Sequence, residues 1–207
     1  MMRPVIVFLL VAVHAFPVAA AALSVRVVDA KGRPVRDAVV TLRPIGAAAH
    51  ASPPSGSYSV SQKDLQFHPF VLVVPVGANV SFPNRDATKH HVYSFSQAKR
   101  FELKLFARDQ SRSVRFDKPG VVPLGCNIHD AMTAFIVVTD SPWTARTNPQ
   151  GIAQFANAPN AATRMIVWHP YLRAPGNSVG KLVAPGRRSE SLVVNLRQPP
   201  RLVNSDY

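Results

Sequence analysis

The chain has 207 residues, with 24 Lys and Arg against 11 Asp and Glu, so its formal net charge is +13. With 47% hydrophobic residues and 19 prolines, this composition predicts a folded, turn-rich chain of one or two small domains. It contains no long helical pattern and no nucleic-acid-binding motif. The basic surface favours acidic partners or anionic membrane surfaces, or it serves only solubility.

The first 22 residues have the pattern of a secretory signal peptide. A short positive segment with Arg3 precedes an apolar run over residues 5–16, and small residues follow at 18–22. The run is too short to span a membrane with proper flanks. We expect cleavage after Ala20, Ala21 or Ala22, and no later segment is apolar enough to cross a bilayer. The sequence therefore predicts an exported protein, most simply in a bacterial periplasm.

The rest of the chain alternates in hydropathy with a period of two and is punctuated by Gly, Pro, Asn and Asp, which predicts an all-β protein. Two strands come first, at 23–29 and 35–44, around a turn at 30–34. A small-residue loop or linker covers 47–56. The following strands are predicted at 70–77, 78–82, 91–95, 101–106, 113–116, 121–125 and 134–138.

The loop between the last two of these strands carries three metal-binding residue types within one heptapeptide. Cys126 is the only cysteine of the chain, and His129 and Met132 follow it at intervals of three. A trigonal Cys and two His with a weak axial Met is the ligand set of a blue-copper electron-transfer site. His90 and His91, at an upstream strand end, are the candidates for the second histidine. In an exported protein an unpaired thiol indicates a reactive group or a ligand.

Residues 62–140 resemble a cupredoxin, most closely the amicyanin- and plastocyanin-like members. The order of strands and turns matches, and the Cys-x-x-His-x-x-Met spacing is that of the short amicyanin loop. The resemblance implies a Greek-key β-sandwich that holds one type 1 copper, Cu(I) or Cu(II), through His90, Cys126, His129 and Met132. It aligns His90 with the first histidine ligand.

Two positions depart from the cupredoxin pattern. His91 stands where the family has an Asn that tethers the two ligand loops, and Gly125 replaces a bulkier residue often found before the cysteine. Neighbouring side chains on a strand point to opposite faces, so we expect His91 to project away from the metal or to lie behind the ligands. Asn127, His91 and Asn84 are candidates for supporting the ligands, although ordinary turn chemistry also explains Asn84.

The flanking segments resemble a second fold. Residues 24–42 are similar to the opening of a carboxypeptidase regulatory-like, prealbumin-type β-sandwich, and 147–155, 164–170 and 189–196 to its later strands. The alternative is that these strands only decorate the cupredoxin. The predicted organisation is a signal peptide at 1–22, a first part of the outer sandwich at 23–56, the cupredoxin at 57–142, a second part of the sandwich at 143–197 and a loose tail at 198–207.

Several other polar residues suggest only structural roles. We expect His169 to pack beside Trp168, His68 to lie at the surface or at a rim, and His50 to lie in a loop. Asp86 and Asp130 are interpreted as turn and loop carboxylates. No catalytic triad, paired carboxylates or phosphate-binding loop is present, and four protein ligands leave a metal no open position for substrate. We therefore expect no enzymatic activity.

Three functions are compatible with these features. The first is an exported single-electron carrier whose donor or acceptor is a redox protein, for instance a cytochrome or dehydrogenase with an acidic surface. The second is periplasmic copper binding or delivery without redox turnover. The third is a metal-free envelope module that binds carbohydrate or another protein through the outer sandwich, which would leave the Cys-His-Met pattern unexplained.

Overall fold

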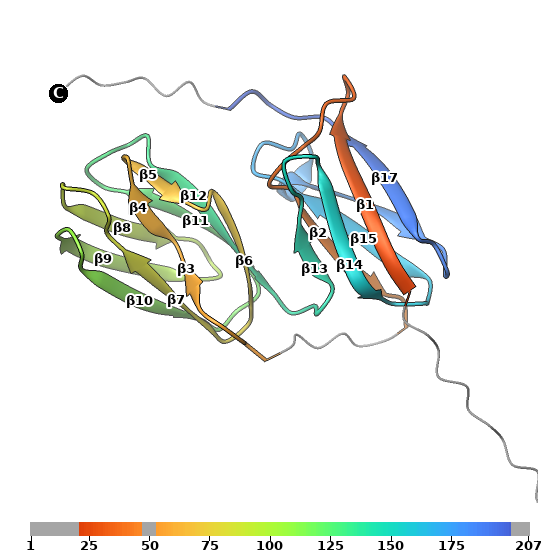
Figure 1. Ribbon diagram of the computed structural model, residues 1–207, viewed down its shortest axis with the longest axis horizontal. Helices are drawn as coiled ribbons and strands as arrows, with labels where there is room; N and C mark the ends of the chain where they lie inside the picture. The colour runs from red at the N-terminus through yellow and green to blue at the C-terminus, as the bar shows by residue number, and fades with distance from the viewer. Residues whose placement is uncertain (1–20, 47–52, 200–207) are drawn as a thin grey trace, which may run out of the picture.

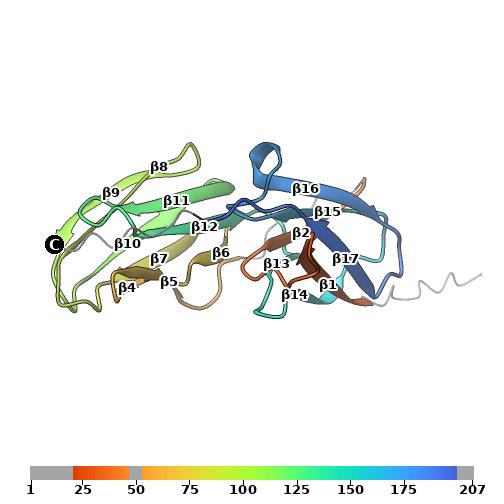
Figure 2. The ribbon, with the colours of Figure 1, turned by 90° about the horizontal axis from the view of Figure 1, so that it is seen from above.

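The structure is a computed structural model and describes residues 21–46 and 53–199. Strands dominate it, which confirms the predicted all-β class, and they form two β-sandwiches side by side (Figures 1 and 2). The predicted signal peptide, His50, most of the 47–56 loop and most of the tail lie outside the described residues. Within the described part of the chain, no helix has the length and hydropathy needed to span a bilayer.

The site-bearing sandwich comes from the middle of the chain. Its larger sheet has the order β6-β12-β11-β8-β9 and its smaller sheet the order β10-β7-β3, with a separate hairpin of β4 and β5. Two of the pairings, β12 with β6 and β3 with β7, are parallel. The strands are β3 (Tyr58–Ser59), β4 (Ser61–Lys63), β5 (Gln66–His68), β6 (Val71–Pro75), β7 (Ala78–Pro83), β8 (His90–Phe95), β9 (Arg100–Phe106), β10 (Ser111–Phe116), β11 (Gly120–Cys126) and β12 (Thr133–Thr139).

The second sandwich combines the two ends of the described chain. Its sheets have the orders β14-β1-β17 and β13-β2-β15-β16, so β1 and β2 pair with strands more than 100 residues further along. A 3-10 turn, η1 (Pro175–Asn177), precedes β16. The strands are β1 (Ala21–Asp29), β2 (Val39–Pro44), β13 (Thr144–Arg146), β14 (Ile152–Ala158), β15 (Thr163–Trp168), β16 (Ser178–Val183) and β17 (Ser189–Val194). The exact domain limits and the prealbumin-type resemblance stay predictions.

One predicted strand is shorter than the sequence indicated. Residues 35–44 read as a single strand, but β2 begins only at Val39. Asp37 has a φ of 61°, in the left-handed region that interrupts an extended strand. Its side chain accepts a hydrogen bond from Arg146, so tertiary contacts hold this turn in place.

Each sandwich buries its own apolar core. Phe82, Phe106 and Phe116 are fully buried in the site-bearing sandwich, where they pack with Cys126 and Met132. Leu42 and Met165 are fully buried in the second sandwich. Burying one such side chain contributes about 1.5–3 kcal/mol, so these faces fix the register of the strands.

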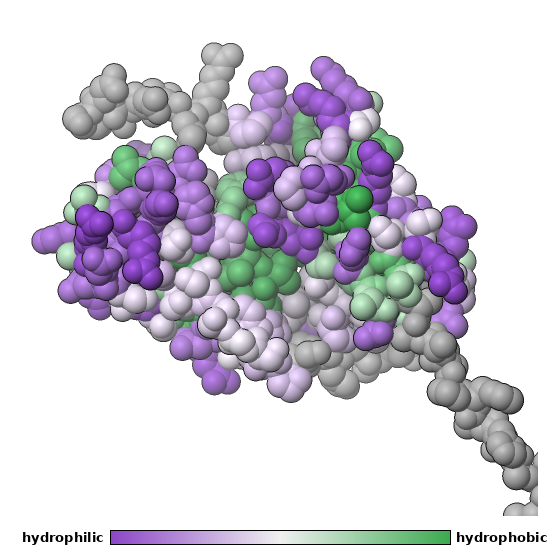
Figure 3. Space-filling view, viewed as in Figure 1, coloured by the Kyte–Doolittle hydropathy of each residue, from purple (hydrophilic) through white to green (hydrophobic). Residues whose placement is uncertain are grey.

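A third apolar cluster joins the two sandwiches. Val39 and Trp168 of the second sandwich pack on Val71 and Val137 of the larger site-bearing sheet, and the Trp168 ring meets Phe135 edge-on at 5.6 Å. Figure 3 shows hydrophobic side chains gathered where the two sandwiches meet. An ion pair between Arg43 and Asp140 borders this contact. The second sandwich thus covers part of the outer face of the sheet that carries Cys126.

Candidate metal centre

Three predicted ligand residues meet at one end of the site-bearing sandwich. His90 is the first residue of β8 and Cys126 is the last residue of β11, and these antiparallel strands pair Cys126 with Val92. The backbone N–H of Asn127 donates to the carbonyl of His91 at 3.1 Å, which extends the ladder into the loop. His129 follows in the loop that leads to β12.

The side-chain donor atoms of this cluster converge on the sulfur. The Nδ1 atoms of His90 and His129 lie 3.7 and 3.8 Å from Cys126 Sγ, and the three atoms all lie within 4.8 Å of one another. Metal–sulfur and metal–nitrogen bonds of about 2.3 and 2.0 Å at 120° place the two donors about 3.7 Å apart. The donors therefore have the separation of a trigonal two-nitrogen, one-sulfur site, and this cluster could hold a metal ion.

Met132 completes the predicted set from inside the core. Its side chain is buried and packs in the same apolar cluster as Cys126. The backbone N–H of Met132 donates to the carbonyl of His129 at 2.9 Å, so the loop folds as a turn between the two residues. Met132 as the axial ligand stays a prediction. Asp130, in the same loop, is exposed.

The adjacent histidines point in different directions. His90 is fully buried and its Nδ1 faces Cys126. His91 lies partly exposed, with its Nε2 2.9 Å from the Glu102 carboxylate on β9. The alternation of a strand explains this difference. His91 supports the ligand loop only through its backbone carbonyl, which accepts from Asn127.

The sequence indicates an ordinary turn carboxylate at Asp86, and the structure corrects this. Its Oδ2 atom lies 2.8 Å from His90 Nε2, on the side of the ring opposite Nδ1. Asn84 has a larger role than turn chemistry alone would give it, because it is fully buried and its amide nitrogen donates to the carbonyls of Thr88 and Phe106 at 2.8 and 3.1 Å. The Asn84 Oδ1 atom accepts from the backbone N–H of Asp86. Contacts with His90 and with the backbone of Asp64 and Leu65, residues that folding brings next to it, separate Asp86 from other turn aspartates.

The electrostatics of the pair favour a neutral imidazole beside a carboxylate. Burial lowers the pKa of His90, and the hydrogen bond and charge of Asp86 only partly oppose that effect. Burial raises the pKa of Asp86, but hydrogen bonds from His90 and from the backbone N–H groups of Leu65 and Asp64 outweigh it, so this pKa lies below its ordinary value. A neutral His90 that donates from Nε2 presents a lone pair at Nδ1, as metal binding requires.

The presence of a glycine before the cysteine has a steric explanation. A Cβ atom at Gly125 would lie 2.8 Å from the ring and hydroxyl atoms of Tyr93 on β8. Gly125 and Tyr93 are direct partners in the ladder. The Tyr93 ring therefore occupies the space that a larger residue before Cys126 would need, which accounts for this departure from the cupredoxin pattern.

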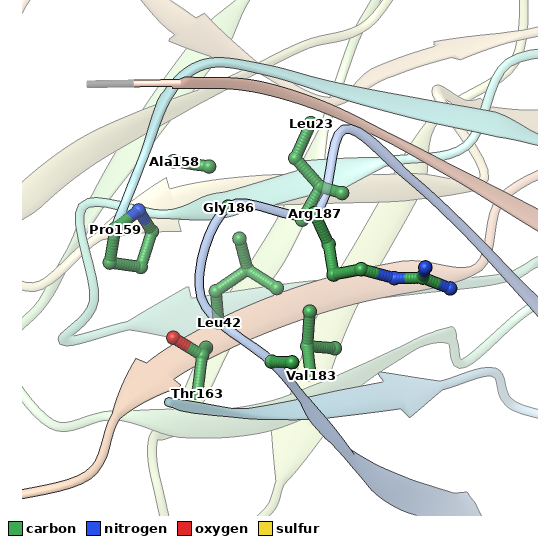
Figure 4. A pocket seen from close by; sticks show the side chains of 9 residues that line it. Leu23, Leu42, Ala158, Pro159, Thr163, Val183, Gly186 and Arg187 are labelled. Atoms are coloured by element: carbon green, nitrogen blue, oxygen red, sulfur yellow. The ribbon is translucent and has the colours of Figure 1, made fainter. Parts of the chain in front are cut away.

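The other histidines of the described chain lie apart from this cluster. His169 is buried in the second sandwich, where its ring meets Tyr171 at 5.6 Å, and His68 contacts the carbonyl of Lys63 at the surface. The second sandwich also has a pocket between its sheets, but its volume is about 10 Å³, roughly that of one water (Figure 4). Mostly apolar side chains, among them Leu23, Leu42 and Val183, line it.

Comparisons with known proteins find similarity among solved structures. No family model and no curated protein matches the chain. Among solved structures it is similar to a copper nitrite reductase from Thermus scotoductus (26% identity, TM-score 0.39, 47% of this chain) and spans a quarter (25%) of that protein's length. A purple cupredoxin from Nitrosopumilus maritimus matches at 19% identity and TM-score 0.37, over 40% of this chain and 100% of its own. An amicyanin variant matches at 25% identity and TM-score 0.38, over 48% of this chain and 98% of its own.

The chain is thus similar to cupredoxins over just under half of its length. The similarity is weak over the whole chain, with TM-scores below 0.4. A functional proposal therefore depends on the geometry of the His90, Cys126 and His129 cluster itself.

Proposed function

We propose that this protein is an exported single-electron carrier that binds one type 1 copper through His90, Cys126 and His129, with Met132 as a weak axial ligand. The observation that supports it is the convergence of two imidazole Nδ1 atoms on one buried thiol at 3.7 and 3.8 Å. A copper ion bound there would supply the one-electron chemistry. The residues of the chain would bind and orient the ion.

The donor set suits an ion that alternates between two oxidation states. A thiolate and a thioether favour Cu(I), whereas two imidazoles keep Cu(II) acceptable. His90 and Cys126 sit on paired strands and are buried, so the sandwich resists rearrangement when the charge changes. Four protein ligands leave no open position for a substrate, which supports electron transfer over catalysis.

The surroundings of His129 support a docking role for this end of the molecule. His129 is the least buried of the three donors, and the neighbouring Ile128 is 45% exposed. A small apolar surface next to a half-buried ligand gives a short route for electrons. The positive charge of the chain favours a redox partner with an acidic surface. The export signal predicted at residues 1–22 would place this encounter in the periplasm.

Copper reconstitution tests the proposal. The chain beginning at Ala21 is purified without metal and titrated with Cu(II), and the visible spectrum and the copper content are measured. We expect one copper per chain, an intense thiolate-to-copper charge-transfer band, and repeated oxidation and reduction without metal loss. Cys126→Ser, which removes the only thiol, is the control that should abolish the band.

Other outcomes distinguish the alternatives. A colourless protein with one bound copper, or one that releases copper at each reduction, would indicate copper binding for delivery. Absence of stable copper binding would reject the proposal and favour a metal-free binding module.

A further inference from the structure

The Asp86 carboxylate connects the candidate ligand His90 to a separate hairpin. Its Oδ2 atom lies 2.8 Å from His90 Nε2, and its Oδ1 atom accepts from the backbone N–H of Asp64 at 2.6 Å. The N–H of Leu65 lies 3.2 Å from Oδ2. Asp64 and Leu65 form the turn between β4 and β5, and the Asp86 side chain is only 11% exposed. The carboxylate therefore has a fixed position.

This position determines which nitrogen of His90 is available to a metal. An ionised carboxylate only accepts hydrogen bonds, so the 2.8 Å contact places the ring proton on Nε2. The lone pair then lies on Nδ1, the atom 3.7 Å from Cys126 Sγ. A carboxylate behind a histidine ligand also makes the imidazole more basic. Its negative charge stabilises a doubly charged ion more than a singly charged one.

We propose that Asp86 is a positioning residue that selects the Nδ1-ligating tautomer of His90 and shifts the relative affinity of the site toward Cu(II). The inference rests on the proposed function, because it assigns a role toward the same copper. It extends the site beyond the four predicted ligands to the β4–β5 hairpin, whose backbone N–H groups hold the carboxylate in place.

A purely structural role for Asp86 makes a different prediction. If the carboxylate only joined the hairpin to the ligand loop, its replacement would disturb the loop and weaken Cu(I) and Cu(II) binding equally. An electrostatic role weakens Cu(II) binding more. The ratio of the two affinities therefore separates the roles, whereas stability or total copper binding would not.

The chain contains a natural control for this test. Glu102 contacts His91 Nε2 at 2.9 Å, the same type of carboxylate–histidine pair one residue further along β8, but His91 faces away from Cys126. Asp86→Asn keeps an oxygen that can accept from His90 and removes the charge. Glu102→Gln makes the same chemical change beside the other histidine.

The experiment measures Cu(I) and Cu(II) affinities of the wild type and both variants by competition with chelators. Loss of a carboxylate behind a histidine ligand costs about 10–100-fold in metal affinity, so we expect this loss for Cu(II) in Asp86→Asn, with a clearly smaller loss for Cu(I). Glu102→Gln should stay within about twofold of the wild type for both ions, because exposed ion pairs contribute little. Equal losses for both ions, or no loss, would overturn the proposal.

A second measurement needs neither a variant nor copper. Nitrogen-15 NMR of the metal-free wild type reports the tautomer of each histidine, and we expect a protonated Nε2 and an unprotonated Nδ1 for His90. The opposite tautomer would overturn the positioning role even if Asp86→Asn did not fold. If the wild type failed to bind copper, the proposed function would fail while the tautomer result would still test the positioning of His90.

Discussion

The two sandwiches bury polar groups in contrasting ways. In the second sandwich the buried Glu190 carboxylate lies 2.6 Å from Lys181 and 3.0 Å from Arg187, so each charge has a counter-charge. In the site-bearing sandwich the buried groups at one end are a thiol and an imidazole, Cys126 and His90. Their donor atoms face one another at 3.7 Å.

This difference separates a structural polar cluster from a candidate metal centre. A buried charge is tolerated when an opposite charge compensates it, and the pair then needs nothing further. Several donor atoms directed at one point, as here, are instead the arrangement that binds a metal ion. The predictions below test whether substitutions in the site-bearing sandwich change copper binding, whereas substitutions in the second sandwich change only stability.

The largest effect should come from replacing the two neighbouring histidines one at a time. We expect His90→Ala to abolish the thiolate-to-copper band, because it removes a donor that faces Cys126. His91→Ala should keep the band with at most a shifted potential, because His91 contacts Glu102 instead. Visible spectroscopy of the copper-loaded variants checks this. Loss of the band in His91→Ala alone would show that the metal lies on the other face of β8.

Truncation of the second core should change stability without changing the site. Leu42 is fully buried there, and we expect Leu42→Ala to lower the free energy of unfolding by about 2–5 kcal/mol. The charge-transfer band of the folded variant should match that of the wild type. Denaturant unfolding and the visible spectrum are the two measurements. A changed band in the folded variant would show that the interface at Trp168 transmits strain to the copper ligands.

The second sandwich should also contain a pH-dependent element that does not involve metal. Burial lowers the pKa of His169 from 6.5 to about 4, although the charge of Asp37 acts in the opposite direction. Its Nδ1 accepts the backbone N–H of Tyr171 at 3.2 Å, which requires the neutral ring. The folded pKa lies below the unfolded one, so the unfolded chain binds more protons between pH 6.5 and 4.

Stability from His169 is therefore complete above pH 6.5 and is lost as the pH falls toward 4. We expect a loss of about 1–2 kcal/mol between pH 7.5 and pH 5. Urea unfolding of metal-free protein at the two pH values measures it. The comparison is with His169→Gln, in which this part of the pH dependence should disappear. An equal loss in the variant would assign the effect to other groups.

The smallest expected effect is a change in reduction potential that distinguishes two buried methionines, one in each core. Met132 is 1% exposed near Cys126, and Met165 is 0% exposed in the second sandwich. Replacement of either by Leu should cost less than about 1.5 kcal/mol. We expect Met132→Leu to keep copper and colour but to raise the reduction potential, because a weak axial ligand for Cu(II) is lost. Voltammetry should find Met165→Leu unchanged, and an unchanged potential in Met132→Leu would remove Met132 from the ligand set.

The local sequence was enough to predict most of the strands and the ligand loop. Alternating hydropathy predicted β1, β2 and β6 to β12, and the resemblance to a prealbumin-type sandwich implied β14, β15 and β17. The spacing of Cys126, His129 and Met132 places them within one tight turn. The sequence also predicted that His90 and His91 would face opposite ways, since this follows from the geometry of a single strand. These features depend on contacts between residues close in the chain.

Tertiary structure decided what supports the ligands. The β4–β5 hairpin went unpredicted because its strands are three residues each and largely polar, which leaves no periodic signal. Asp86 looked like any turn aspartate until folding brought it to His90 and to the backbone of that hairpin. Gly125 had no visible reason until Tyr93 was placed across it. Each of these contacts joins different strands or loops, so it depends on how the sheets pair and pack, which hydropathy and spacing along one segment do not encode.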